Sequence, residues 1–492
     1  MGIIIKQSIR GTIWSYLGVG VGFITTAYLF PNYLSTDTIG LFGLLVSWSV
    51  LLSQFFSLGI NGVTARLFPY FRNKENGHNG YLFIAFMVIA VGFGLFLIAY
   101  FIFSPWLLES NLEKSRLFSE YIYLLVPLTF FTLIFNVLDS YNKLLYDAVF
   151  GTFLIEFLQR VLILFLVCLF VFDLINPAQL IMAYAGAVSA KGAVIFFYLI
   201  YKGELNIKPR LNFIDKNLGR EMLNVALFSI LTGVGGNVIF NIDKIIVNEM
   251  LGLSVTGIYT IAFFFGTLVV IPSRPLQRIS GTLIADAWKR SDLSYIEDIY
   301  KRSSLNQFII GAFLFGGIWV NIDSILIILG PDYYEGKWVI FFIGLGYLFD
   351  MATGVNALII AYSKYYRLSL WFLLIQIVVF ISTMFLFIPL WGITGAGVSV
   401  ALSFMTSNIL RYTFLFRKYN MQPFSIRFPG IIVAFLAAYF AGYILPDLPL
   451  VWDILCRGSV FAIIYFTVII SFRISADVNS TVIRILKQIK IW

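Results

Sequence analysis

Long apolar runs, separated by short polar segments, dominate the pattern along this chain of 492 residues. A helix needs roughly 20 mostly apolar residues to cross the hydrocarbon core of a bilayer. About fourteen runs reach this length, and we expect each of them to form a membrane-spanning α-helix. The expected spans are 12–33, 40–63, 81–104, 121–143, 149–172, 178–201, 222–248, 257–279, 305–329, 338–361, 368–389, 394–415, 428–445 and 454–472.

The basic residues between these runs predict which side of the membrane each loop occupies. With the N-terminus inside, roughly 26 of the lysines and arginines fall in inner segments. Outer segments hold only Lys114, Arg116, Lys337 and Arg457. Because cytoplasmic loops carry the excess of Lys and Arg, this asymmetry indicates an even number of spans with both termini in the cytoplasm.

The composition agrees with a chain whose solvent is lipid. Hydrophobic residues make up 60% of it and charged residues 12%, whereas about a quarter of the residues in soluble domains are charged. The net charge of +9 comes mainly from loop residues that set the topology, so it does not indicate a nucleic-acid partner. The pattern therefore predicts an all-α, multi-pass integral membrane protein.

Two pairs of similar segments indicate an internal repeat. TDTIGLFGL (36–44) resembles SVTGIYTI (254–261), and GAVS (186–189) resembles AGVS (396–399). Both offsets are about 210–217 residues, which favours two six-helix lobes in pseudo-repeat followed by two C-terminal helices. The expected divisions are an N-terminal lobe over 1–201, a cytoplasmic linker over 202–221, a C-terminal lobe over 222–427, and the last two spans with a cytoplasmic amphipathic tail over 428–492.

Longer segments carry a resemblance to a known family. LSTDTIGLFGLLVSWSVLLSQFFSLGINGVTARLFP (34–69) has a polar turn, a Gly-x-Phe element, and a glycine and an arginine near its end. NIDKIIVNEMLGLSVTGIYTIA (241–262) looks like the matching segment of the second half, and WGITGAGVS (391–399) is a third element. With the repeated halves and the two extra helices, these segments resemble the polysaccharide transporter branch of the multidrug/oligosaccharidyl-lipid/polysaccharide exporter superfamily.

The resemblance implies a flippase for lipid-linked oligosaccharides. Such a protein moves undecaprenyl-diphosphate-linked sugar units from the inner to the outer leaflet of a bacterial cytoplasmic membrane, by alternating access, for the synthesis of surface polysaccharide such as O-antigen. The implied partners are the lipid-diphosphate-linked oligosaccharide, membrane lipid and the polysaccharide polymerase machinery. No cofactor and no metal are expected.

Basic residues within the apolar runs, or at their ends, are the candidates for binding the diphosphate, because a charge within the bilayer is costly unless it has a function or a partner. Arg160 lies four residues after Glu156, so it could bind the diphosphate or form an ion pair that orients a helix. Lys191 has no acidic residue within one turn and should face a cavity or a partner. The full set is Arg160, Lys191, Arg274, Arg278, Arg66 and Lys244, of which Arg278 and Arg66 could equally be topological anchors.

Acidic residues in the runs are the candidates for ion coupling or gating. Asp350 could bind a proton or Na⁺, or it could be a buried carboxyl group hydrogen-bonded to a neighbouring Thr or Asn. Asp243 could be a gate residue or the partner of the adjacent Lys244. Glu156 is expected to hold Arg160 in the absence of cargo.

Three other functions are weighed against the flippase. A Na⁺- or H⁺-coupled small-molecule exporter favours an acidic cavity, whereas this chain has more intramembrane Lys and Arg. A lipid II flippase usually has several arginines in its first two helices, where only Arg10 and Arg66 are found. A glycan polymerase or ligase needs a large outer loop, and the outer loops here are short. Nucleotide-binding and His-Glu-x-x-His motifs are absent from the sequence, so no catalytic residue is expected.

Two charged amphipathic segments are expected to lie on the inner membrane surface. The first is 284–303 (IADAWKRSDLSYIEDIYKRS) and the second is 481–492 (TVIRILKQIKIW). Both would anchor the chain to the cytoplasmic leaflet through their basic residues.

Overall fold

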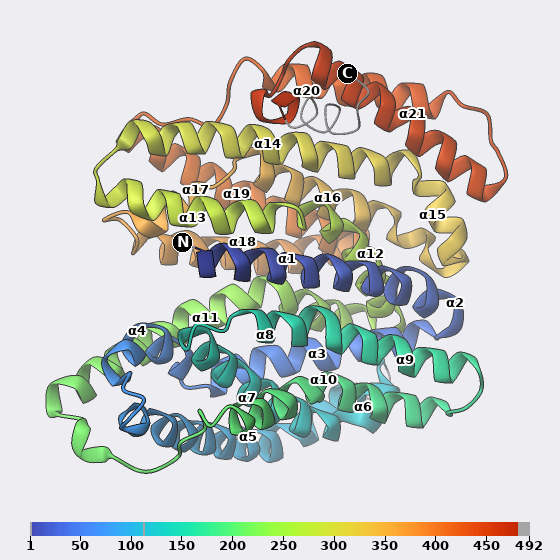
Figure 1. Ribbon diagram of the computed structural model, residues 1–492. Helices are drawn as coiled ribbons and strands as arrows, with labels where there is room; N and C mark the ends of the chain where they lie inside the picture. The colour runs from blue at the N-terminus through green and yellow to red at the C-terminus, as the bar shows by residue number, and fades with distance from the viewer. Residues whose placement is uncertain (1, 112–113, 481–492) are drawn as a thin grey trace. The chain divides into compact units, whose positions relative to one another are not determined.

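The computed structural model describes residues 2–111 and 114–480, most of which are helical, and it contains no strand within these ranges (Figure 1). The segment 481–492, which is predicted to be an amphipathic surface helix, lies outside the described residues. The chain divides into two compact units, residues 1–260 and 261–492. The boundary between them falls inside a helix rather than in the linker at 202–221, so the division into two six-helix lobes remains a prediction.

Unit 1 consists of helices of very unequal length, joined by tight turns. Its α-helices are α1 (Gly2–Phe23), α2 (Phe30–Tyr33), α3 (Thr36–Phe56), α4 (Ile60–Phe71), α5 (Tyr81–Asn111), α6 (Arg116–Tyr121), α7 (Leu125–Leu144), α8 (Val149–Phe153), α9 (Gln159–Val171), α10 (Pro177–Tyr201), α11 (Lys216–Leu251) and the start of α12 (Leu253–Thr267). Single π-helical stretches, η1 (Ile24–Leu29) and η4 (Leu154–Leu158), link α1 to α2 and α8 to α9. Short 3₁₀ segments lie at Gly77–Gly80, Ile122–Leu124 and Leu211–Phe213.

Unit 2 continues the same architecture. Its α-helices, after the end of α12, are α13 (Ser273–Lys289), α14 (Leu293–Val320), α15 (Ile322–Leu329), α16 (Lys337–Ala352), α17 (Asn356–Tyr362), α18 (Leu368–Trp391), α19 (Ile393–Tyr419), α20 (Phe428–Tyr443) and α21 (Leu450–Ser471). Two 3₁₀ segments, η6 (Leu268–Val270) and η7 (Pro331–Gly336), precede α13 and α16.

Every expected span corresponds to an apolar helix, although not every helix is long enough to cross a bilayer. Twelve helices in the described ranges are sufficiently long and apolar, and the bent pair 331–352 and 356–362 raises the number to 13. The remaining expected span, 428–445, is α20, which has only 16 residues. The all-α membrane fold is therefore confirmed, whereas the count of fourteen full spans is not.

Two of the helix interruptions have a clear local cause. The helix expected over 257–279 gives way to η6 and a turn before α13 begins at Ser273, directly after Pro272, because proline removes a backbone donor and favours the first turn of a new helix. The prediction of one amphipathic helix over 284–303 is wrong. The chain reverses at Ser291, whose φ is +56°, and the segment is shared between α13 and α14.

Aromatic side chains fill the interior of unit 1. Phe68 on α4 packs edge-on against Tyr81 on α5 and Tyr141 on α7, with ring centroids 5.2 and 5.1 Å apart. All three side chains are fully buried, and the Tyr81 hydroxyl is 2.6 Å from the Thr64 hydroxyl. The buried phenol group thus keeps a hydrogen-bond partner, as a polar group within a membrane requires.

The core of unit 2 joins α14 to the last two helices, which Figure 1 shows side by side. Phe461 and Tyr465 on α21 are fully buried, and Tyr465 donates to the Ile309 carbonyl at 2.8 Å.

Large apolar side chains on the outer helix faces of both units remain exposed, for example Phe101 at 71% and Trp371 at 62%. Such exposed apolar side chains would contact lipid acyl chains in a membrane.

Candidate functional site

Glu156 and Arg160 form the ion pair that their spacing predicts. Arg160 donates from Nη2 to Glu156 Oε2 at 2.8 Å and from Nη1 to the Gly18 carbonyl on α1, also at 2.8 Å. The two side chains are 19% and 28% exposed. Glycine is needed where α1 crosses η4, because a Cβ at Gly18 would lie 1.7 Å from the Glu156 carbonyl oxygen. The guanidinium group therefore joins α1 to the start of α9 within the membrane segment of unit 1.

Lys191 lies on α10 and is held by a neutral group. Its ammonium donates to Gln159 Oε1 at 3.2 Å and lies 5.7 Å from the centre of the Phe135 ring. The side chain is half-buried. Gln159 immediately precedes Arg160 on α9, so the residue that holds Lys191 and the second cation of this region are consecutive on one helix. Within the chain, the partners of Lys191 are thus this amide and the aromatic ring.

Asp243 and Lys244 lie next to each other on α11, and Asp243 also contacts α12. The Asp243 side chain is fully buried, and its Oδ2 accepts a hydrogen bond from the Tyr259 hydroxyl at 2.9 Å. Lys244 Nζ is 3.7 Å from Asp243 Oδ1. The carboxylate is thus satisfied by both the adjacent lysine and a tyrosine of the repeated segment.

The two repeated segments of the sequence pack against each other in unit 1. A Cβ at Gly40 on α3 would lie 2.1 Å from the Leu253 carbonyl, and a Cβ at Gly257 on α12 would lie 1.9 Å from the Thr36 carbonyl. The contact is reciprocal, because each glycine faces the residue four positions before the other. The Thr36 and Ser254 hydroxyl oxygens are 2.6 Å apart at the same crossing. The contacts of α3 and α12 are therefore related by an approximate local two-fold axis, and the two helices are close enough for their backbones to touch.

Asp350 in unit 2 belongs to a polar network between α16 and α19. Asn408 Nδ2 donates to Asp350 Oδ1 at 2.8 Å, and Asn408 Oδ1 accepts from Thr353 and Asn356, each at 2.8 Å. Arg411, one turn after Asn408, is close enough to Asp350 for their charges to interact. The carboxylate is thus bonded to an Asn side chain, but that residue is 58 positions away in the sequence, and the side chains of the adjacent Thr353 and Asn356 reach the carboxylate only through it. The sequence spacing indicated neither this Asn nor the nearby cation.

The other predicted cations lie on exposed positions. Arg66 is exposed on α4, and Arg274 and Arg278 are exposed on the first two turns of α13. Arg274 nonetheless has an interaction within the chain. Exposure leaves room for contact with a phosphate or with lipid headgroups, so their roles in binding remain proposals.

A charged cluster at one end of unit 1 was not predicted from the sequence. Asp147 accepts from the Tyr198 hydroxyl at 2.6 Å and from the Lys202 ammonium at 2.5 Å. Burial alone would raise the pKa of Asp147, but these hydrogen bonds outweigh it and lower that pKa below its ordinary value. Asp147 is 51 positions from Tyr198 and 55 from Lys202, so no sequence spacing could have joined the acid to the two residues at the end of α10.

Glu204 sits in the same part of unit 1 as a second unpredicted acid. Its carboxylate accepts from Lys74 at 2.7 Å and lies 3.4 Å from His78 Nε2. Burial alone would raise the pKa of Glu204, but the hydrogen bonds to Lys74 and His78 outweigh this effect. The pKa of Glu204 is therefore below its usual range. This cluster ties the loop after α10 to the loop between α4 and α5.

Asp453 and Arg457 on α21 are a further pair that the sequence analysis left out, although their spacing equals that of Glu156 and Arg160. Arg457 Nε donates to Asp453 Oδ1 at 2.7 Å, and both side chains are buried.

Among the described residues, no group of three or more His, Cys, Asp or Glu side chains could hold a metal ion. The intramembrane chemistry of the described chain thus consists of ion pairs and amide networks.

Comparison with known proteins gives a family and a fold. The sequence model of the family described as "Polysaccharide biosynthesis protein" matches residues 6–277, more than half of the chain. A search of curated proteins gave no match.

Two solved structures are similar to the whole architecture. One is the lipid II flippase MurJ in an inward closed conformation, with a TM-score of 0.73 and 14% identity, covering 95% of this chain and 98% of that one. The other is an inward-facing multidrug resistance MATE family transporter of the MOP superfamily, with a TM-score of 0.61 and 13% identity, covering 82% and 97%. At these identities the likeness shows the fold, and the predicted fold class is confirmed.

Proposed function

Because the chain belongs to the polysaccharide biosynthesis protein family, we propose that it is a flippase for undecaprenyl-diphosphate-linked oligosaccharides in a bacterial cytoplasmic membrane. The membership confirms the resemblance to the polysaccharide branch of the superfamily. The transporter fold supports movement of a cargo rather than catalysis. Both termini in the cytoplasm, alternating access, the two-lobe division and delivery to a polysaccharide polymerase are parts of the same proposal.

Lys191 is the observation that supports an anionic cargo most strongly. Its ammonium is half-buried in a membrane segment and bonded to a neutral amide, which does not compensate the charge. An intramembrane cation is retained at a cost, and a phosphate oxygen would bind it more strongly than an amide oxygen does. A cargo diphosphate could therefore displace Gln159 at little expense.

Arg160 would contribute the second contact. Its guanidinium already holds Glu156 and the Gly18 carbonyl, and a guanidinium can present paired donors to a phosphate. Glu156 would hold Arg160 in the absence of cargo. Arg66, Lys244, Arg274 and Arg278 remain proposed contacts to the cargo, and Asp350 and Asp243 remain proposed coupling or gate residues.

A lipid II flippase is the second candidate function, because the whole chain is similar in fold to MurJ. Both cargoes carry a lipid diphosphate, so the intramembrane cations do not separate them. Rescue of cells depleted of their lipid II flippase, without rescue of surface polysaccharide in the other test strain, would establish this alternative.

The proposal is tested by complementation of a bacterial strain that lacks its oligosaccharide-lipid flippase. The wild-type chain should restore surface polysaccharide, Lys191→Met should not, and Lys191→Arg should restore most of it. Lys301→Met is the matched control, since Lys301 is an exposed lysine paired with Glu297. Immunoblots of membrane fractions show that each variant inserts. Normal polysaccharide with Lys191→Met would contradict the cationic site, and no rescue by the wild type would contradict the proposed function.

A further inference from the structure

Unit 2 contains a cavity of about 800 Å³ that has no part in the site described above. It lies where α14 ends and α15 begins, facing the loop between α20 and α21, at the end of α14 opposite its turn with α13 (Figure 1). Its volume is within the roughly 300–1,000 Å³ typical of small-molecule sites. The proposed topology places this end of unit 2 on the outer side of the membrane.

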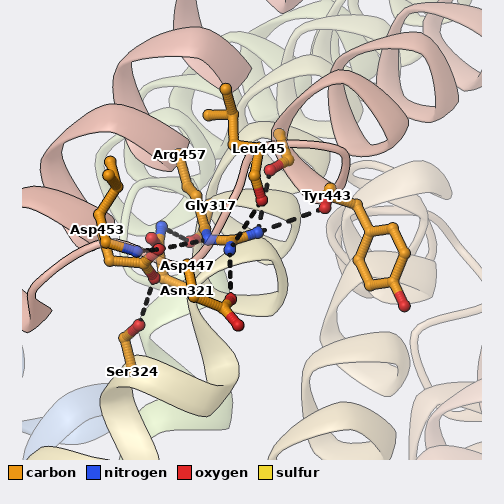
Figure 2. Close-up of polar contacts among 10 residues, drawn as sticks. Gly317, Asn321, Ser324, Tyr443, Leu445, Asp447, Asp453 and Arg457 are labelled. Atoms are coloured by element: carbon orange, nitrogen blue, oxygen red, sulfur yellow. Dashed lines mark hydrogen bonds and ion pairs between the residues drawn. The ribbon is translucent and has the colours of Figure 1, made fainter.

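Arg457 lines the cavity, and Figure 2 shows how the surrounding groups converge on it. Its donors bond to Asp453 at 2.7 Å, to Asp447 at 3.0 Å, and to the carbonyls of Gly442 and Leu445, each at 3.1 Å. A guanidinium group has five N–H donors, so little capacity is left for a ligand. Arg457 therefore shapes the loop after α20 and is not itself a binding group.

The second oxygen of Asp453 links Arg457 and α21 to α15, which also lines the cavity. It accepts from the Ser324 hydroxyl on α15 at 2.6 Å. The arginine, the aspartate and the serine thus connect α15, α21 and the end of α20 by charge-assisted hydrogen bonds. A site held in this way is preorganised, because its walls need not rearrange when a ligand enters.

Two further carboxylates, those of Asp323 and Asp447, line the cavity and are exposed. The Asp447 side chain is fully exposed, and one of its oxygens is used by Arg457. The Asp323 side chain is 75% exposed and pairs with Lys337 at 2.5 Å. With Asp453 included, three acids line the cavity against two bases, and each base is already paired with an acid. This balance opposes the binding of a phosphate or another anion.

Aromatic rings and aliphatic side chains supply most of the remaining surface, the aliphatic ones being Val320, Ile322, Ile327, Leu445, Leu448 and Leu450. Tyr439 and Tyr443 are stacked, with ring centroids 6.1 Å apart and planes 23° apart, and Tyr443 is 66% exposed. Trp319, on α14, also lines the cavity, and its ring centre lies 6.0 Å from the Lys337 ammonium. Rings present flat apolar faces, while carboxylates and the phenol groups present hydrogen-bonding atoms beside them.

We propose that this cavity is a saccharide-binding site on the outer side of unit 2. A sugar ring offers hydroxyl donors to Asp323 and Asp447, and apolar C–H faces to the tyrosine and tryptophan rings. An acyl chain would leave the second oxygen of each carboxylate without a donor, and the charge balance disfavours a diphosphate. The inference deepens the proposed function and rests on it: the site would hold the glycan part of the cargo after the lipid diphosphate has crossed.

The test uses the full chain in lipid nanodiscs. The probe is a set of short oligosaccharides released from the host strain's surface polysaccharide and freed of lipid and phosphate. Saturation-transfer NMR titrations should show binding to the wild type. Asp323→Asn and Tyr443→Ala should each weaken binding by about tenfold, the effect of losing one hydrogen bond to a charged group or one stacking surface. Asp298→Asn and Tyr366→Ala, at exposed positions outside the cavity, should leave it unchanged.

The controls separate the site from the proposed function. The use of two independent variants, each checked for an unchanged thermal melt, guards against loss of binding by unfolding. Absence of saccharide binding, or an affinity equal to that of the wild type in both cavity variants, would overturn the proposal. So would tighter binding of tetraethylammonium than of the saccharides, because the cavity would then be a cation site. If the wild type restores surface polysaccharide but binds no saccharide, only the cavity proposal fails. If it binds saccharide but restores no polysaccharide, only the proposed function fails.

Discussion

The crossing of α3 and α12 allows a sharp prediction about how the two repeated segments hold together. In Gly257→Ala, the new methyl carbon would lie 1.9 Å from the Thr36 carbonyl oxygen and 3.1 Å from the Gly40 nitrogen. Both neighbours are backbone atoms, so no side-chain rotation can relieve the clash. The helices must separate by about 1.1 Å to restore a distance of 3.0 Å. Overpacking of this kind costs about 1–3 kcal/mol.

Disulfide cross-linking measures this cost directly. The Thr36 and Ser254 hydroxyl oxygens are 2.6 Å apart, so cysteines at both positions should cross-link readily once Cys168 and Cys456 have been replaced. Adding Gly257→Ala should slow cross-linking by about 5–150-fold, the equivalent of 1–3 kcal/mol.

Gly94→Ala on α5 is the matched control for this experiment. It also introduces a methyl group into an apolar helix, but no atom lies within 4 Å of it. Alanine is favoured over glycine in helices by up to about 1 kcal/mol, so this variant should be neutral or stabilising. Equal cross-linking rates in the wild type and Gly257→Ala would refute the close-contact reasoning, as would an equal slowing by Gly94→Ala.

Three further predictions concern the charged groups. Arg160→Ala should lower the free energy of unfolding by about 1.5–3 kcal/mol, because its charge-assisted hydrogen bonds are lost. It should also abolish surface polysaccharide. An unchanged thermal melt would contradict the predicted loss of stability. Asp350→Asn should remove any response of flipping in vesicles to imposed pH or Na⁺ gradients, and an unaltered response would exclude coupling at this residue. The lowered pKa of Glu204 means that its ion pairs stabilise the fold above its ordinary pKa of 4.5, and that this contribution is lost as the pH falls through the lower folded-state pKa. Glu204→Gln should therefore flatten the acid limb of the melting temperature against pH, and parallel curves for variant and wild type would argue against the assignment.

The predictions that succeeded rest on local pattern. Apolar runs identify nearly every span because a bilayer imposes the same length and polarity on each helix independently of the others. The Glu156–Arg160 pair follows from spacing along one helix, and Asp453–Arg457 could have been found in the same way. The helix expected over 284–303 failed, because amphipathic periodicity continued across Ser291 while the backbone reversed there.

The predictions that sequence could not make involve partners from distant helices. Lys191 has no local acid, and its partner Gln159 is 32 residues away on another helix. Asp350 has a cation near it only because α16 and α19 pack together and bring Arg411 within range. The Asp147 and Glu204 clusters join loops in the same manner. Charges that look isolated along the chain thus find their partners through packing.

The sequence by itself determined the membrane class, most helix positions and the family resemblance, because each of these depends on hydrophobic period, charge placement or short motifs. Only the tertiary structure decided that Gly40 and Gly257 of the two repeats touch, and that Asp323, Asp447 and three aromatic rings surround one cavity in unit 2. The physical reason is the distance along the sequence over which each interaction acts. Helix formation in lipid depends on neighbours within a few residues, whereas a crossing or a cavity depends on which faces of distant helices meet.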